Sequence, residues 1–167
     1  MDFSEAKKIF YACYGSHFFI DREYGKVYYK YKVPKDLEKI WLMDIQQELY
    51  TAINNSFGHD QFEHVCNICL TLNSNNSAKL LLSLLQNGKE DSFTRLLYCE
   101  DLARIMRDID DNLLKNNILQ EIMLQKLFIL SNPKNIDEKY KLDNYCNLVE
   151  EKLIKRLNEL LDNLHLL

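Results

Sequence analysis

Glycine and proline are scarce in this chain, with four Gly and two Pro among 167 residues. Glycine tolerates positive φ angles and proline cannot continue a helix, so both residues interrupt regular structure. All six lie where the hydrophobic pattern changes: Gly15, Gly25, Pro34, Gly58, Gly88 and Pro133. No glycine is part of a glycine-rich phosphate-binding motif, which excludes that class of nucleotide site. The positions of these glycines and prolines predict long helices joined by tight connections.

Long apolar runs are also lacking, because no run approaches the roughly 20 residues of a membrane-spanning helix. The first ten residues, MDFSEAKKIF, begin acidic and lack the basic-then-apolar order of a signal peptide. The five cysteines are odd in number and scattered along the chain, which is typical of reduced thiols rather than of a disulfide framework. We therefore expect a cytoplasmic protein with no membrane partner.

A strong excess of charge of one sign is absent as well. The net charge is −4, and hydrophobic residues make up 47% of the chain. Residues 1–39 carry eight Lys or Arg and six Asp or Glu, so the excess of acid lies in the remainder. This balance argues against a polyanion binder. The length and composition predict one soluble globular domain over residues 1–167.

Apolar residues recur at helical spacing along most of the chain. After Pro34, a stripe that includes Leu37, Trp41, Ile45, Leu49 and Ile53 predicts a helix of about five turns. Further helices are expected over residues 3–14, 60–73, 78–85, 92–110, 113–130 and 137–164. The helix over 113–130 is the richest in apolar residues, so we expect it to be the central one.

A different pattern occupies the segment between the first two helices. Val27, Tyr29, Tyr31 and Val33 alternate with Lys26, Tyr28, Lys30 and Lys32. Period-two alternation of β-branched and aromatic residues is typical of a strand. Phe18 and Ile20 would supply the partner strand, with a turn at residues 23–25. The predicted fold is therefore mainly α, a compact bundle of six or seven helices (34–167), with a helix and a small β-hairpin in residues 1–33.

The C-terminal helix has a heptad-like spacing of leucines from Leu153 to Leu167, preceded by Cys146 and Val149 on the same stripe. Two heptads are too few to establish a coiled coil. Core packing within one chain is favoured, and a homodimer through this helix is the alternative.

Histidine and cysteine gather at His59, His64, Cys66 and Cys69, which are ligand types that zinc prefers. Asp60 and His64 also lie four residues apart, on one helix face. Both cysteines fall on the predicted apolar stripe, where cysteine behaves as a small hydrophobe. The metal hypothesis therefore depends on His59, Asp60 and His64, and core cysteines with surface histidines are the favoured alternative.

Lysine and tyrosine alternate over Tyr28, Lys30, Lys32 and Lys35, a combination that could stack bases and contact phosphates. The favoured alternative is a solvated strand face, because edge lysines also block aggregation and no known nucleic-acid motif is present. These four residues are candidate contacts for a partner protein or a nucleic acid.

Catalytic patterns are missing from the sequence. Cys13 and His17 are four apart, but a nucleophilic thiol needs a lowered pKa and a third, orienting group, and nothing in the sequence supplies either. We expect no cofactor. The resulting hypothesis is a non-catalytic protein–protein interaction or regulatory module whose partner is another protein. The alternatives are a nucleic-acid-associated regulator using the Tyr/Lys segment and a metal-dependent enzyme using the His59/His64 region.

Overall fold

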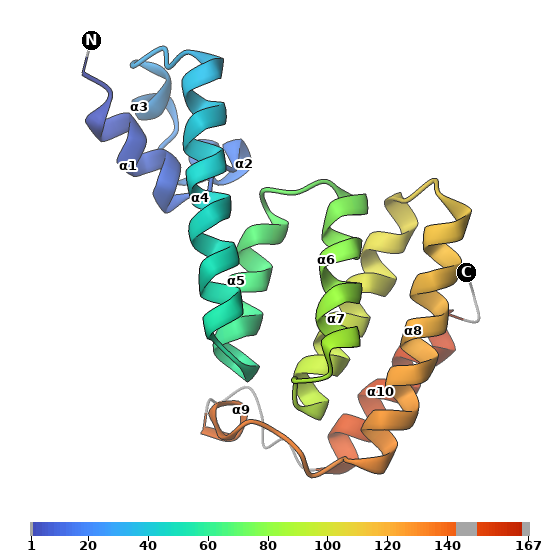
Figure 1. Cartoon of the computed structure of the whole chain (residues 1–167). Helices are drawn as coiled ribbons and strands as arrows, with labels where there is room; N and C mark the ends of the chain where they lie inside the picture. The colour runs from blue at the N-terminus through green and yellow to red at the C-terminus, as the bar shows by residue number, and fades with distance from the viewer. Residues whose placement is uncertain (1, 143–149, 165–167) are drawn as a thin grey trace. The chain divides into compact units, whose positions relative to one another are not determined.

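The structure is a computed structural model that describes residues 2–142 and 150–164. Within these residues the chain forms only helices and no strand, which confirms the mainly α class (Figure 1). The helices are α1 (Ser4–Ala12), α2 (His17–Glu23), α3 (Lys26–Tyr29), α4 (Lys35–Asn55), α5 (Gly58–Cys69), α6 (Ser74–Asn87), α7 (Ser92–Ile105), the 3-10 turn η1 (Met106–Asp108), α8 (Asn112–Ser131), α9 (Glu138–Leu142) and α10 (Glu150–Leu164).

Two compact units make up the chain. The first comprises Met1–Ser56 and Asp60–Leu72, and the second comprises Phe57–His59 and Asn73–Leu167. No helix in the described part of the chain is both long and apolar enough to cross a bilayer.

The first unit is built on α4, which packs against α1. Its buried residues recur every fourth position at Trp41, Ile45, Leu49 and Ile53, which is one face of a helix. Phe10 of α1 lies against Trp41, with ring centroids 5.7 Å apart. The stripe expected after Pro34 is thus the core-facing side of α4.

The expected β-hairpin is wrong. Residues 17–29 form the short helices α2 and α3, and Gly25 joins them with a φ of +48°. A lone hairpin is marginal in water and needs packing on one face. The residues that are buried here are also not the ones that the alternation indicated. Tyr28 is buried, whereas Val27 and Tyr29 are exposed. Burying one aromatic ring on α4 is a tertiary contact that the local alternation does not encode.

The second unit is centred on α7, which contacts α6, α8 and α10 (Figure 1). Asp91 caps α7 by accepting hydrogen bonds from the backbone N–H groups of Phe93 and Thr94, and Asp111 caps α8 in the same way. Side-chain caps of this kind satisfy the orphan donors of the first helical turn. The sequence expectation of a central helix over 113–130 is wrong, because α7, and not α8, is surrounded by the other helices.

Two boundaries also differ from expectation. α6 begins at Ser74, four residues before the predicted start, because the Asn73 side chain caps it by accepting from the Asn76 N–H. The predicted helix over 137–164 is described as α9 and α10. Leu153, Leu157, Leu160 and Leu161 of α10 are buried, and α10 packs on α7. The remaining stripe positions Cys146, Val149 and Leu167 lie outside the described residues.

Candidate functional sites

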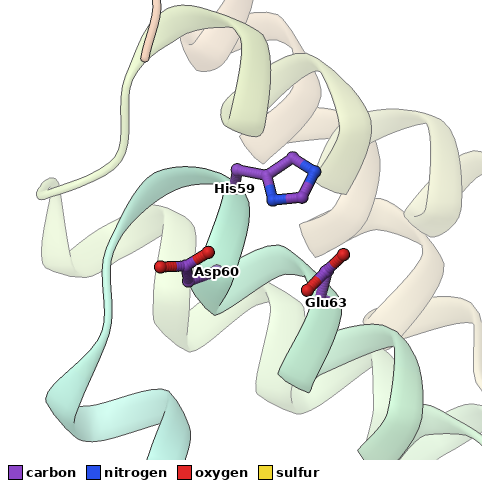
Figure 2. Close-up of side chains that lie close together, drawn as sticks. All are labelled: His59, Asp60 and Glu63. Atoms are coloured by element: carbon purple, nitrogen blue, oxygen red, sulfur yellow. The ribbon is translucent and has the colours of Figure 1, made fainter. Parts of the chain in front are cut away.

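The start of α5 brings three possible metal ligands together. His59, Asp60 and Glu63 each offer one ligand atom, and these atoms all lie within 4.8 Å of one another (Figure 2). Positions three and four apart share a helix face, so Glu63 lies with His59 and Asp60, two of the three ligands predicted from the sequence. His64, which is four residues from Asp60, is not in this group. The spacing rule could have identified Glu63.

The surroundings of this cluster are also defined. The His59 backbone N–H donates to Asp137 Oδ2 at 3.3 Å, and its ring lies edge-on to Tyr140 with centroids 5.1 Å apart. Three ligands fall short of a closed four-ligand zinc site. Carboxylates in a first turn are also favoured by the positive end of the helix dipole, which disfavours a cation. The cluster therefore has an ordinary structural explanation, and the metal site stays a prediction.

The Tyr/Lys segment is divided by the helical conformation. Lys30, Lys32 and Lys35 are exposed, as a partner surface would require. Tyr28 is 2% exposed, and its hydroxyl donates to Glu38 Oε1 at 2.6 Å. Burial, and then this hydrogen bond, raise the pKa of Tyr28. A base could not stack on the buried Tyr28 ring, so the three lysines alone remain as candidate contacts.

His17 lies in a hydrogen-bond network that the sequence did not reveal. Tyr29 donates its single hydroxyl proton to Asp21 Oδ1 at 2.6 Å, so it can only accept at its 3.3 Å contact with His17 Nδ1. The other ring nitrogen, Nε2, lies 3.5 Å from Glu38 Oε2. Both ring nitrogens of His17 therefore face oxygen atoms of neighbouring side chains.

This network has a structural rather than a catalytic character. The hydrogen bond to Asp21, followed by burial, raises the pKa of Tyr29 to about 12, so the phenol stays protonated near neutral pH. Both ring nitrogens of His17 face partners of their own, and none of these is Cys13. Burial, and secondarily Glu23, raises the pKa of the Cys13 thiol. A raised pKa disfavours the thiolate, so the geometry gives the Cys13 and His17 pair no nucleophilic role.

The solvent side of α8 carries the largest group of exposed apolar side chains along any one described helix. Leu113, Leu124 and Leu127 are 71%, 59% and 64% exposed. We call the whole group the α8 face: Leu113, Leu119, Met123, Leu124, Leu127 and Leu130. At 100° per residue these positions fall on one side of the helix, with uncharged Asn116 and Gln120 between them. Scattered apolar residues are normal on surfaces, but a contiguous strip of this kind marks an interaction site.

The opposite side of α8 points polar groups into the core. Glu121 and Gln125 are each 6% exposed. Gln125 Nε2 donates to Glu121 Oε1 at 2.6 Å, and Gln125 Oε1 accepts from Arg95 Nη1 of α7 at 2.5 Å. Gln86 of α6 also donates to Glu121 Oε2 at 3.4 Å. Rotating α8 to bury its exposed leucines would break these bonds and would bring the buried Ile118 and Ile122 to the surface, so both features fix which side of the helix faces outward.

Two shallow hollows run along the α8 face. One, of about 600 Å³, is lined by Leu119, Gln120, Met123, Leu124, Lys126 and Leu127. The other, of about 640 Å³, is lined by Met106, Arg107, Asn112, Lys115, Asn116, Leu119 and Leu164. Leu119 lines both, so the hollows adjoin. From Asn112 to Leu127 the helix rises about 22 Å, which is the length of a four-turn helix.

Comparisons of the chain with protein-family models, with curated proteins and with solved structures found no match. The case for a function therefore depends on the geometry of these sites.

Proposed function

We propose that this chain is a protein-binding module whose α8 face receives an amphipathic helix of a partner protein. Helix-in-groove recognition uses apolar anchors spaced at i, i+3, i+4 and i+7 along one side of the bound helix. The two adjoining hollows on α8 suit that mode, because their combined length fits about four helical turns.

The orientation of α8 is the observation that carries this proposal. An ordinary surface helix would turn Glu121 and Gln125 to water and bury its leucines. α8 buries both of these polar side chains beside Leu114, Ile118, Ile122 and Ile129, and it leaves the six apolar side chains of the α8 face exposed. Arg95 supplies the buried donor that pairs with Gln125. Exposing this much apolar surface opposes solubility, so a covered state is favoured.

The C-terminal helix supports self-association less well. Of the leucines that suggested a homodimer, Leu153, Leu157 and Leu160 are buried, and α10 packs on the chain's own α7. A homodimer through α10 would need another surface of that helix.

The test uses a matched pair of apolar-to-acid substitutions. Leu124→Asp changes the α8 face, and Met43→Asp changes an exposed apolar side chain of α4 that is 68% exposed. A binding partner purified from the source cells would be titrated calorimetrically against the wild type and both variants. A central apolar anchor contributes about 2 kcal/mol to binding, so we expect Leu124→Asp to weaken binding about thirtyfold and Met43→Asp to leave it unchanged. Equal affinities for the two variants would refute the proposal.

A further inference from the structure

The charged residues that line the two hollows on the α8 face are of one sign. α8 carries three charged residues, Lys115, Glu121 and Lys126, and the single acid among them is buried. Arg107 lines the same hollow as Lys115. Among the described residues, none of these three cations forms an ion pair, and no acidic side chain lines either hollow. The lining of the two hollows is therefore positive, although exposed aspartates precede α8 at positions 108, 110 and 111 and the whole chain has a net charge of −4.

We infer that the helix bound by the α8 face is acidic along the edge that meets Arg107, Lys115 and Lys126. This inference rests on the proposed function and adds the chemistry of the partner. Interfaces pair potentials of opposite sign, which raises the rate of encounter and disfavours partners of the wrong charge. A partner helix with leucines on one side and Glu or Asp beside them would meet both the apolar strip and its basic edge.

A second copy of the chain fits this surface less well. In a two-fold pair, each contact of residue i with residue j is repeated as j with i. Lys115 and Lys126 flank the same edge of α8, so an antiparallel pair would bring Lys115 of one copy near Lys126 of the other. The α8 face holds no exposed acid to compensate. Like charges opposite each other disfavour that pairing.

A membrane surface is also a weaker match. Helices that lie on anionic lipid are rich in Lys and Arg on the polar side and use Trp or Phe in the apolar side. The α8 face contains Leu and Met, and only three cations border it. We therefore assign the surface to an acidic helix and use vesicles as a competing arm of the test.

The experiment uses two designed helical peptides with the same leucines, one with Glu and one with Lys along the flanking edge. Their affinities for the full chain would be measured by fluorescence anisotropy at low and high salt. Each exposed ion pair adds at most a few-fold in affinity, so we expect the Glu peptide to bind about tenfold tighter at low salt. Screening should reduce this preference at high salt.

Three variants separate the contributions. Lys115→Glu combined with Lys126→Glu should reverse the preference between the peptides, whereas Lys79→Glu, at an exposed lysine of α6 outside both hollows, should leave it intact. Leu124→Asp should weaken both peptides.

Each outcome distinguishes the inference from the function on which it rests. Equal binding of the two peptides, with loss of both in Leu124→Asp, would overturn the acidic partner and leave the docking surface standing. No binding of either peptide would overturn the docking surface itself. Binding to anionic vesicles in place of the Glu peptide would overturn the inference in favour of a lipid surface.

Discussion

Arg95 connects α7 to the buried polar side chains of α8, so replacing it is the sharpest test of that polar network. It is 2% exposed and donates to Glu90 O at 2.9 Å as well as to Gln125 Oε1. Its guanidinium also lies 3.9 Å from the centroid of the Phe128 ring. Arg95→Met keeps an unbranched apolar stem of similar reach but removes every one of these polar contacts.

The expected loss of stability in Arg95→Met follows from the polar groups that stay buried without their partner. Glu90 is 4% exposed, and its Oε2 lies 4.0 Å from Arg95 Nη2. Without Arg95 this carboxyl is buried with no counter-charge, and Gln125 loses a donor. Removing one partner of a buried pair costs about 3–5 kcal/mol. Domains of this kind have an unfolding free energy of about 5–15 kcal/mol in total, so the variant should retain only part of its stability.

The assay is amide hydrogen exchange of α7 and α8 at about pH 7, supported by urea unfolding followed by circular dichroism. The single tryptophan, Trp41, lies in the first unit, so its fluorescence does not report directly on α7. Arg156→Met is the matched control: it removes two 2.7 Å bonds to Glu100, but Arg156 is 42% exposed. Partial exposure limits that loss to about 1 kcal/mol.

The pH dependence supplies a second readout. Burial raises the pKa of the Glu90 carboxyl, and Arg95 opposes that rise. In Arg95→Met the ionised form of Glu90 becomes more costly, so the loss of stability should be largest near neutral pH and should shrink as Glu90 is protonated. Equal losses for Arg95→Met and Arg156→Met, independent of pH, would refute the reasoning.

Four further predictions concern single positions. Gly15→Ala should lower the unfolding free energy by about 1–3 kcal/mol in urea titrations, because Gly15 has a φ of +70° and an added Cβ would lie 2.8 Å from a leucine side chain; an unchanged midpoint would contradict this. Burial raises the pKa of Glu90, so its contribution to stability is present at low pH and is lost as the pH rises through that pKa. In a series of thermal melts, the stability of Glu90→Gln relative to the wild type should therefore increase as the pH rises. A difference in melting temperature that does not change with pH would contradict this. Asp111→Ala removes a cap that accepts two backbone hydrogen bonds, so α8 should lose about 1 kcal/mol in the same urea assay; no loss would rule out the cap. If the start of α5 holds zinc, titration calorimetry should show binding abolished in His59→Ala and kept in His64→Ala, and equal effects would exclude this ligand set.

Helix positions were predictable where one face of the pattern is plainly apolar. The stripe at Trp41, Ile45 and Leu49 predicted α4, and the same residues are buried in the structure. Proline and glycine also marked the ends of several helices, since their backbone preferences act locally.

Long-range contacts explain where sequence reasoning failed. The alternation around Tyr28 suggested a strand, but the buried ring and its bond to Glu38 of α4 favour a short helix. In α8, the predicted stripe included Leu114, Ile118 and Ile122, which are buried, but apolar residues occur on nearly every side, so periodicity could not show that the opposite side stays exposed. Arg95, from another helix, donates to Gln125, and Gln125 donates to Glu121, so two polar side chains share the buried side of α8 with its isoleucines.

The candidate sites also differ in how far the sequence could predict them. Helical spacing alone could have linked Glu63 to His59, because the two are four residues apart. The α8 face could not be found in this way, because a leucine in a rich apolar run is equally suited to the core. Its exposure follows because the opposite side of α8 packs into the core with both its isoleucines and its polar network.

Side-chain exposure along α8 is the most direct test of the account. Hydroxyl-radical footprinting read by mass spectrometry would compare Met123, Leu124 and Leu127 with the buried Ile118 and Ile122 of the same helix. We predict rapid oxidation of the first three and protection of the two isoleucines in the free chain. Protection of all five, or oxidation of the isoleucines ahead of the leucines, would contradict the outward orientation of the α8 face.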